Sequence, residues 1–461
     1  MNLLTITNLY PRPDQPQRGM YNKQLFSALA EKLRLSVEQI KQPTTNNQQP
    51  TTDQMTNVVL VPEWRIWRWG RIRNWKDSAC QRSTTLYLPV FYFPLMGGSL
   101  SAWTYKQSLE YQTSSVKWKG DNPFQDCDAV FVSWLYPDGA AAVRVAEKLG
   151  KPVWIQVLGS DRFYLRNPFC RGQILKACHY AKGVLPNCKF LADELIKEGV
   201  DEKKVHVVPN GVDSDLFKYR SKEEAIKKLQ VTPVINTPSF DRAGGQASYK
   251  LQGFLPALAG PLEAEATQQP RNKYGDQALN NPTTKLVLFV GNLIHVKGVD
   301  LLLEAWSVLV KTSTHSHANT PILLLIGEGK LRKKLERQAG RLGIADCVHF
   351  LGSRPHDEIA LWMNIAGCLC LPSRSEGMPN VVLEAFASGL PVVATDVGNC
   401  AEIFTREPSG IVVETGNYGA ISEGIMNVLQ SEYDRKQIAE RCAKKYSWQK
   451  SAKQIMDVLS V

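Results

Sequence analysis

The stretch Arg374-Ser-Glu-Gly-Met-Pro-Asn-Val-Val-Leu-Glu-Ala-Phe-Ala-Ser-Gly389 predicts a loop that leads into a short helix. Pro379 suits the first helical position, where its missing N–H costs nothing. Gly389 can adopt the left-handed conformation that ends a helix. Glu376 is therefore expected in the loop before the helix, and Glu384 inside it.

The start of this helix is a candidate binding site. Its free amides and the positive end of the helix dipole suit a phosphate or a sugar hydroxyl. A carboxylate on each side, from Glu376 and Glu384, can hold sugar and ribose hydroxyls while the amides hold the charge. The alternative is an ordinary capped helix on the surface, because two glutamates at this spacing are common by chance.

Strands and helices alternate around this stretch through the C-terminal half. Such alternation predicts a parallel sheet with covering helices, and ligands of such sheets gather at the carboxyl ends of the strands. Lys297, Glu328 and Glu376 each follow a predicted strand at that edge. The expected strands are 285–290, 322–326, 348–351, 368–371 and 392–394, and the expected helices are 299–309, 331–342 and 357–364.

The N-terminal half repeats the scheme less clearly, so two α/β domains with a cleft between them are expected. Two stretches break the pattern. Residues 41–57 read as a long polar loop, and residues 231–284, rich in Pro, Gly, Ala, Gln and Asn, as an irregular insertion. The expected strands of this half are 3–7, 129–134, 153–157, 183–186 and 205–208, and the expected helices are 21–32 and 140–149.

The two glutamates and their surroundings resemble the glutamate–seven residues–glutamate motif of retaining glycosyltransferases of family four. The resemblance is strongest from 285 to 403, and it implies the GT-B fold, in which two Rossmann-like domains with parallel sheets face each other across a cleft. It also implies that Glu376 faces the donor sugar as a catalytic residue and that Glu384 binds the ribose. The backbone implied around the donor is that of Gly377, Met378, Pro379, Asn380 and Val381.

A second loop, Val290-Gly-Asn-Leu-Ile-His-Val-Lys-Gly298, joins a predicted strand to a helix. Gly291 permits a tight turn, and Lys297 can reach a phosphate as a point charge. In the resembling family two basic residues of this loop hold the donor diphosphate. Lys297 matches one of them and is the second candidate catalytic residue, whereas Asn292 stands where arginine is usual. The alternative for Lys297 is a surface lysine beside a turn.

Three further loops supply candidate contacts. Lys330 or Arg332 can replace the charge that the second loop lacks. Gly19 lets the backbone approach a phosphate at a helix start, and the resemblance implies that its loop closes over the donor. Asp161 can hydrogen-bond an acceptor hydroxyl, although Leu158 stands where the family often has histidine. An ordinary loop glycine and a turn carboxylate are the alternatives for Gly19 and Asp161.

The segment Pro209-Asn-Gly-Val-Asp213 resembles the one that crosses between the two domains of the family. It sets an acceptor-side domain at 1–211 and a donor-binding domain at 212–446, with a last helix at about 447–461 that packs back on the first domain. Asp-x-Asp pairs occur at 126–128 and 213–215, but neither lies in the context of a metal-dependent glycosyltransferase. The resemblance therefore implies transfer without a bound metal.

Length and charge limit the classes of protein to which the chain can belong. The chain has 461 residues, enough for two or three domains, and a formal charge of +11 that favours anionic partners. Its ten scattered cysteines fit reduced thiols in a cytoplasmic protein. The sequence has no apolar run of about eighteen residues, the length that a membrane span requires. The first residues read as a strand and not as a signal peptide.

The segment 63–76 interleaves tryptophan with arginine. Tryptophan favours the membrane interface and arginine favours anionic headgroups, so this segment can dock the protein on the inner face of a membrane, near a lipid-linked acceptor. A helix with buried tryptophans and solvated arginines is the alternative. Single-stranded nucleic acid also suits such a pattern, but no surrounding nucleic-acid module supports it.

Together these patterns predict transfer of a sugar from a UDP- or GDP-linked donor to a glycan or lipid-linked acceptor, with retention of anomeric configuration. No cofactor beyond that substrate is expected, and polysaccharide biosynthesis fits by analogy. A catalytically weak nucleotide-sugar-binding or scaffolding relative is the alternative, because Asn292 and Leu158 replace expected polar groups. A dinucleotide-dependent oxidoreductase should carry Gly-x-Gly-x-x-Gly after a strand, which this chain lacks in that context.

Overall fold

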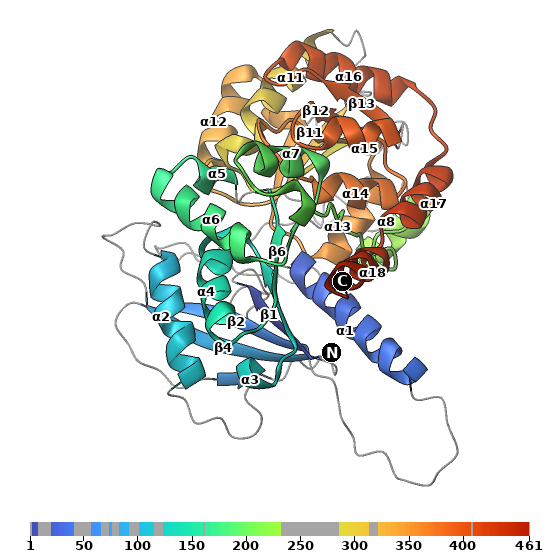
Figure 1. The fold of residues 1–461 in the computed structure, drawn as a ribbon. Coiled ribbons are helices and arrows are strands. Elements are labelled where there is room, and N and C mark those ends of the chain that lie inside the picture. Colours follow the sequence, from blue (N-terminus) through green and yellow to red (C-terminus); the bar gives the residue numbers. More distant parts are fainter. Residues whose placement is uncertain are drawn as a thin grey trace. The chain divides into compact units, whose positions relative to one another are not determined.

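The computed structural model divides the chain into two compact units (Figure 1). Unit 1 contains Met1–Gly211 and Tyr446–Val461, and unit 2 contains Val212–Lys445. The residues that the structure describes are 2–7, 20–40, 57–65, 73–75, 83–91, 101–114, 123–159, 162–231, 285–312, 321–406 and 409–460. The expected loop at 41–57 and the expected insertion at 231–284 therefore lie almost wholly outside the described residues.

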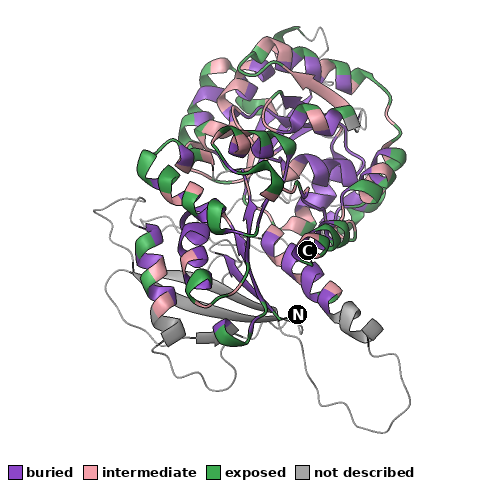
Figure 2. Ribbon diagram, in the orientation of Figure 1, coloured by how far each residue is buried: buried purple, intermediate pink, exposed green. Residues whose placement is uncertain are grey.

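Unit 2 is built on a parallel sheet of six strands in the order β10-β9-β8-β11-β12-β13. Most of its strands are short apolar runs that are buried along their length, as expected for parallel strands covered on both faces. The strands are β8 (Leu286–Val290), β9 (Ile322–Ile326), β10 (Val348–Gly352), β11 (Cys368–Leu371), β12 (Val392–Thr395) and β13 (Gly410–Val413). Figure 2 shows buried strands inside and exposed residues on the outer sides of the helices.

Helices cover both faces of this sheet. The contacts place α11, α12 and α16 together on one face, and α8, α13, α14 and α17 together on the other. The amphipathic α11 buries Leu302, Leu303 and Trp306 against β8 and β9 in the main core of the unit. The bounds are α8 (Lys222–Val231), α11 (Val299–Thr312), α12 (Arg332–Leu342), α13 (His356–Ile365), α14 (Asn380–Ala387), α15 (Cys400–Arg406), α16 (Tyr418–Gln430) and α17 (Arg435–Lys445).

Unit 1 has a seven-stranded sheet in the order β3-β4-β2-β1-β5-β6-β7. All its neighbours are parallel except β3, which runs antiparallel to β4 at the edge. The strands are β1 (Leu3–Thr7), β2 (Asn57–Arg65), β3 (Arg73–Trp75), β4 (Ser83–Phe91), β5 (Ala129–Ser133), β6 (Val153–Val157) and β7 (Gly183–Pro186).

The last helix of the chain, α18 (Trp448–Leu459), completes the core of unit 1. It packs beside α1 (Met20–Ile40), and Trp448 Nε1 donates a hydrogen bond to Gln24 Oε1 at 2.9 Å. Ser447 caps the helix, and its side chain accepts a hydrogen bond from the N–H of Lys450. The remaining helices are α2 (Ser101–Ser114), α3 (Pro123–Asp126), α4 (Ala140–Lys148), α5 (Arg162–Leu165), α6 (Pro168–Tyr180) and α7 (Lys189–Lys197).

Two sequence-based expectations in unit 1 are wrong. Residues 205–208 do not form a regular strand: they make one bridge, between Val205 and Val184, although the N–H groups of His206 and Val208 donate to the carbonyls of Val184 and Pro186, each at 2.9 Å. The alternative of a helix at 63–76 is also wrong for its described part, which belongs to the strands β2 and β3. Residues 66–72 of that segment lie outside the described residues.

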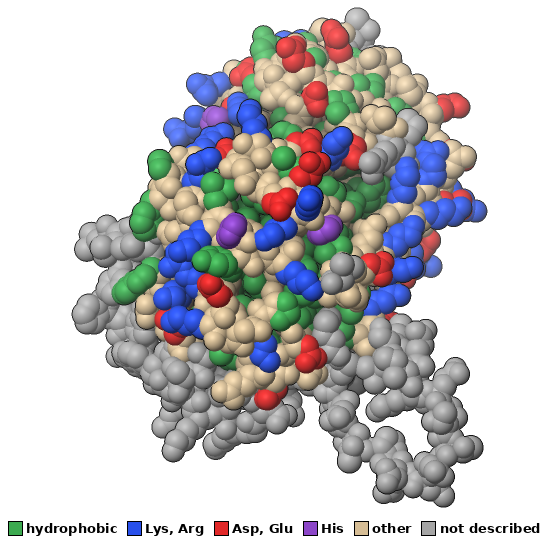
Figure 3. All heavy atoms as spheres, viewed as in Figure 1, with side chains coloured by type: hydrophobic (Ala, Val, Ile, Leu, Met, Phe, Trp, Pro, Cys, Tyr) green, Lys and Arg blue, Asp and Glu red, His purple; other side chains and the backbone are tan. Residues whose placement is uncertain are grey.

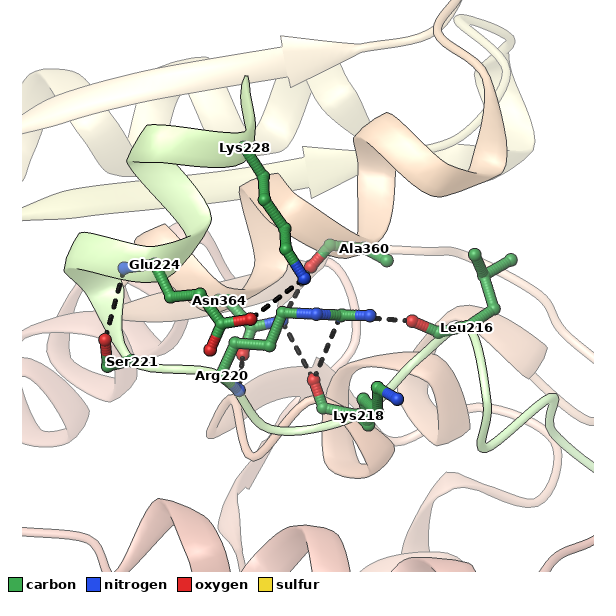
Figure 4. A network of polar contacts seen from close by, with 8 residues as sticks. All are labelled: Leu216, Lys218, Arg220, Ser221, Glu224, Lys228, Ala360 and Asn364. Atoms are coloured by element: carbon green, nitrogen blue, oxygen red, sulfur yellow. Dashed lines mark hydrogen bonds and ion pairs between the residues drawn. The ribbon is translucent and has the colours of Figure 1, made fainter. Parts of the chain in front are cut away.

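The first segment of unit 2 is fastened to α13 by one buried amide (Figure 4). Asn364, 1% exposed, accepts a hydrogen bond from the backbone N–H of Arg220 at 2.6 Å and donates to the carbonyls of Lys218 and Ala360 at 3.0 and 2.8 Å. Ser221 then accepts from the N–H of Glu224 at 3.2 Å at the start of α8. The segment that follows the crossing is thus held by side-chain contacts before any regular element begins.

Replacing Asn364 by leucine should lower the free energy of unfolding of unit 2 by about 2 kcal/mol, because the Arg220 N–H and the Lys218 carbonyl lose their partner. Urea unfolding followed by circular dichroism measures the change. Asn427→Leu is the matched control, since Asn427 is exposed on α16. Equal midpoints for the two variants would contradict this role of Asn364.

Candidate functional site

The predicted site residues of unit 2 meet at the carboxyl edge of its sheet. Strands β8 and β11 are neighbours in the sheet, so the loops that follow them lie side by side. Lys297 ends a short 3₁₀ turn after β8, and Glu376 lies in the loop after β11. The structure therefore brings together the two candidate catalytic residues, which are 79 positions apart in sequence.

Lys297 and Glu376 form a hydrogen-bonded ion pair. Lys297 Nζ donates to Glu376 Oε1 at 2.6 Å, and their side chains are 24% and 11% exposed. Ser373 Oγ donates to the same oxygen at 2.6 Å. Both of these contacts fall on Oε1 of Glu376.

A second ion pair, which the sequence patterns did not reveal, ties the two loops together. Arg374 Nη1 and Nη2 donate to Asp300 Oδ1 and Oδ2, each at 2.7 Å, in a bidentate arrangement. Arg374 Nη1 also donates to the carbonyl of His295, and its backbone N–H donates to the carbonyl of Val296, both at 2.8 Å. Arg374 therefore holds the turn that carries Lys297 through two hydrogen bonds, one from the Arg374 side chain and one from the Arg374 backbone N–H.

Gly298 lets the two loops approach this closely. Its φ of +65° lies in the left-handed region, and a Cβ at this position would stand 2.0 Å from the carbonyl oxygen of Pro372. Gly398 does the same on the other side of the Glu376 loop, with φ +58° and a Cβ position 2.4 Å from the carbonyl oxygen of Glu376. The backbone around Glu376 is therefore packed between the loops after β8 and β12.

Arg374 also changes the acidity of its partner. Burial alone would raise the pKa of Asp300, but the hydrogen bonds and positive charge of Arg374 outweigh burial, and the pKa lies below its ordinary value. Asp300 is therefore a carboxylate at neutral pH, and its pairing with Arg374 stabilises the folded state.

The helix after Glu376 begins one residue later than expected. Pro379 has an extended conformation and precedes α14, which starts at Asn380. Glu384 lies inside the helix, as predicted, and is 5% exposed. Gly389 ends this segment with φ +71°, the left-handed conformation expected of it. The N-terminal end of α14, with the positive end of its dipole, follows directly after Met378 and Pro379, and the Val382 N–H donates to the carbonyl of Pro379 at 3.0 Å.

Arg332 holds the loop after β9. Its Nε donates to Glu336 at 2.9 Å, its Nη1 donates to Glu328, and its Nη2 donates to the carbonyl of Phe350 at 3.1 Å. These contacts engage the guanidinium in the protein, so a role for Arg332 in replacing the charge missing at Asn292 stays a prediction. Asn292 itself is exposed, beside Gly291 at the end of β8.

Two site residues predicted in unit 1 have no described position. Gly19 and Asp161 lie outside the described residues, and Leu158 is partly exposed after β6. Trp134, directly after β5, has φ +104°, a conformation that is rare for a residue with a side chain and is often found at functional sites.

The described part of the chain contains no group of three or more His, Cys, Asp or Glu side chains that could hold a metal ion. The same part of the chain contains no helix long and apolar enough to cross a membrane.

Comparisons with solved structures define the class of fold. Sucrose-phosphate synthase from Thermosynechococcus elongatus superposes with a TM-score of 0.66 at 15% identity, over 100% of this chain and 98% of its own. The HepE protein of Anabaena, solved with UDP, gives 0.64 at 14% identity over 100% of both chains. At these identities the likeness shows the fold alone, and that fold is GT-B, the class with two Rossmann-like domains.

Two family models match the sequence. The model for Glycosyltransferase Family 4 matches residues 90–216, and the model for Glycosyl transferases group 1 matches residues 270–445. The chain belongs to the group 1 glycosyl transferases of glycosyltransferase family 4, which confirms the resemblance seen in the motifs.

A curated relative, the D-inositol 3-phosphate glycosyltransferase of Corynebacterium urealyticum, is 34% identical over 208 residues, or 43% of this chain and 47% of the relative. The chain spans about half the length of the curated relatives it matches.

The pairing of Asp300 with Arg374 predicts a pH dependence of stability. Because the folded-state pKa of Asp300 is lowered, the stabilisation is present above the unfolded-state pKa of about 4 and is lost as the pH falls through the folded-state value. Asp300→Asn should therefore be less stable than the wild type at pH 7, and the difference should shrink below about pH 4. Thermal unfolding at both pH values measures it.

Asp346→Asn is the control for this prediction, because Asp346 is an exposed carboxylate of the same unit. A difference between the wild type and Asp300→Asn that stays constant from pH 7 to pH 3 would show that the Arg374 pair does not depend on the charge of Asp300.

Proposed function

We propose that the protein transfers a sugar from a nucleotide-sugar donor to a glycan or lipid-linked acceptor, with retention of anomeric configuration. The observation that carries the proposal is the Lys297–Glu376 pair at the strand edge, next to the start of α14, in a chain of this family. A cation, a carboxylate and the positive end of a helix in one place match the parts of a nucleotide sugar: diphosphate, sugar hydroxyls and ribose.

The charges suit the demand of the reaction. The bond between the anomeric carbon and the diphosphate oxygen breaks, and its electron pair leaves with the diphosphate. Lys297 and the amides at the start of α14 stabilise the negative charge that gathers there. Glu376 holds hydroxyls of the donor sugar, and Glu384 holds the ribose, the roles that the family motif implies for them.

Retention follows if the acceptor attacks from the face that the diphosphate leaves. The acceptor hydroxyl then forms the new bond to the anomeric carbon, and its proton passes to the departing diphosphate oxygen. This step needs no protein nucleophile. Lys297 and the helix dipole supply positive charge where other transferases use a metal ion, so we propose that transfer proceeds without a bound metal.

The donor base is proposed as uracil or guanine. The HepE structures of Anabaena hold UDP or UDP-glucose, which favours uracil for a chain with the same fold. A cytoplasmic site fits the supply of such donors and the reduced cysteines. Contact of segment 63–76 with an anionic membrane surface is the corresponding proposal for a lipid-linked acceptor.

A thermal-shift screen with UDP, GDP, ADP and their sugar conjugates, in the presence of a chelator, tests the donor site. One nucleotide series should raise the unfolding temperature by about 5 °C or more at roughly a hundredfold excess over Kd, because ligand binding stabilises the folded state by mass action. A well-folded sample that shifts with none of them would remove the donor site and, with it, the proposal.

Substitutions at the pair test its role in transfer. Lys297→Met and Glu376→Gln should each lower kcat at least about a hundredfold, since each removes a contact that stabilises the transition state or places the sugar. Initial rates with the donor found by the screen measure this. Lys333→Met, which removes an exposed lysine of α12, should keep wild-type kcat.

The alternative is a relative that binds nucleotide sugars but turns them over weakly. Asn292 in place of arginine and Leu158 in place of histidine favour it, because each removes a polar group that the family motif supplies. Nucleotide binding without transfer or donor hydrolysis by the wild type would identify this alternative.

A further inference from the structure

One surface of unit 1 has an unusual composition. Residues 162–182, which include α5 and α6, contain five lysines and arginines and neither aspartate nor glutamate. Two acidic side chains pair with this surface: Glu194 of α7 with Arg162 at 3.5 Å, and Glu198, directly after α7, with Arg171 at 2.5 Å. We call the surface formed by α5, α6 and the start of α7 the α5–α7 face.

Large aromatic side chains are exposed on the same face. Phe163 is 45% exposed, Phe169 54%, Tyr180 46% and Phe190 36%. They are four of the eight large hydrophobic side chains that are exposed in the described part of the chain. Figure 3 shows hydrophobic and basic side chains next to one another where Figure 1 labels α5 and α6.

The aromatic residues of α6 lie on its solvent side and not on the side that packs into the unit. Positions 169, 176 and 180 fall within about 40° of one another at 100° per residue, so Phe169, Lys176 and Tyr180 form one stripe. The opposite side buries Ile174 and Cys178. Packing in the core of unit 1 therefore does not explain why this stripe is aromatic.

Three of the four exposed rings of this face have the positive charge of a lysine or arginine close to the ring. The guanidinium of Arg162 lies 4.9 Å from the ring centre of Phe190, and that of Arg166 lies 5.5 Å from the ring centre of Phe163. Lys176 Nζ lies 6.0 Å from the ring centre of Tyr180. In water these cations partly cover the rings. They also place positive charge directly beside the aromatic groups.

We propose that the α5–α7 face binds the surface of an anionic lipid bilayer. Aromatic rings are stable at the level of the headgroups, where their apolar faces leave water, and the neighbouring arginines and lysines can move to the lipid phosphates. The absence of acidic residues from 162–182 fits a negative partner. Phenylalanine has no polar group to read a base or a sugar, which favours lipid over nucleic acid or glycan.

The inference rests on contacts within unit 1 and not on the donor site. It also differs from the proposal for segment 63–76, whose side chains lie outside the described residues. Lipid binding and nucleotide binding are therefore separate outcomes that separate variants can test.

Sedimentation of the full chain with vesicles tests the proposal. Vesicles of phosphatidylcholine with phosphatidylglycerol should bind the wild type, and vesicles of phosphatidylcholine alone should bind it more weakly, with binding to the anionic vesicles falling as salt rises. The triple variant Phe163→Ser, Phe169→Ser and Tyr180→Ser should partition at least about tenfold more weakly, the order of loss expected when the rings no longer enter the interface.

Matched controls separate this face from the rest of the surface. Tyr219→Ser with Tyr418→Ser removes rings of similar exposure from unit 2. Arg166→Gln, Lys176→Gln and Lys182→Gln should weaken binding, whereas Lys333→Gln, Lys334→Gln and Arg337→Gln, with the same loss of charge on α12, should not. An unchanged thermal shift with the donor nucleotide shows that each variant is folded.

Three results would overturn the proposal. The first is equal partitioning of the aromatic variant and its unit 2 control. The second is loss of vesicle binding only when Arg65, Arg68 and Arg71 are replaced, which assigns the membrane contact to segment 63–76. The third is a wild-type protein that does not bind anionic vesicles but instead binds a single-stranded oligonucleotide, or instead forms a dimer that is lost in the aromatic variant.

Discussion

The bidentate pair between Arg374 and Asp300 is the interaction on which the candidate site depends. It joins the loop after β11 to the start of α11, and the same arginine holds the 3₁₀ turn through two backbone carbonyls. Lys297 stands at the end of that turn, and Glu376 stands two residues after Arg374. A planar guanidinium fixes direction as well as distance, so the contacts of Arg374 set the positions of both Lys297 and Glu376.

The parallel sheet of unit 2 also determines where the site residues lie. Parallel strands end at one edge, and the order β9-β8-β11-β12 places the loops after four strands next to one another there. The strands are apolar and buried, whereas the loops are crowded with glycine, because backbone approaches backbone. A substitution at Gly298 or Gly398 would therefore disturb the site through geometry and not through chemistry.

Much of this fold could be predicted from the sequence, because a buried parallel strand is a short, continuous apolar run. The strands 3–7, 153–157, 183–186, 322–326 and 368–371 have the predicted bounds. Strands β2 and β4 were missed, since a proline interrupts the pattern of each, Pro62 in β2 and Pro89 in β4. The motif glutamates and Lys297 could be found because each lies in a short local motif that resembles the family's. Asp300 and Arg374 could not, because a pair 74 residues apart leaves no local signal.

The place of α18 in unit 1 bears on how the protein is made. The chain leaves unit 1 after Gly211, builds all of unit 2, and returns at Tyr446. The ribosome therefore synthesises all of unit 2 before it makes the helix that packs beside α1. The unit whose synthesis begins first thus completes its core only after unit 2 has been made, because α18 contributes to that core. During this interval the apolar side of α1 is open to premature association.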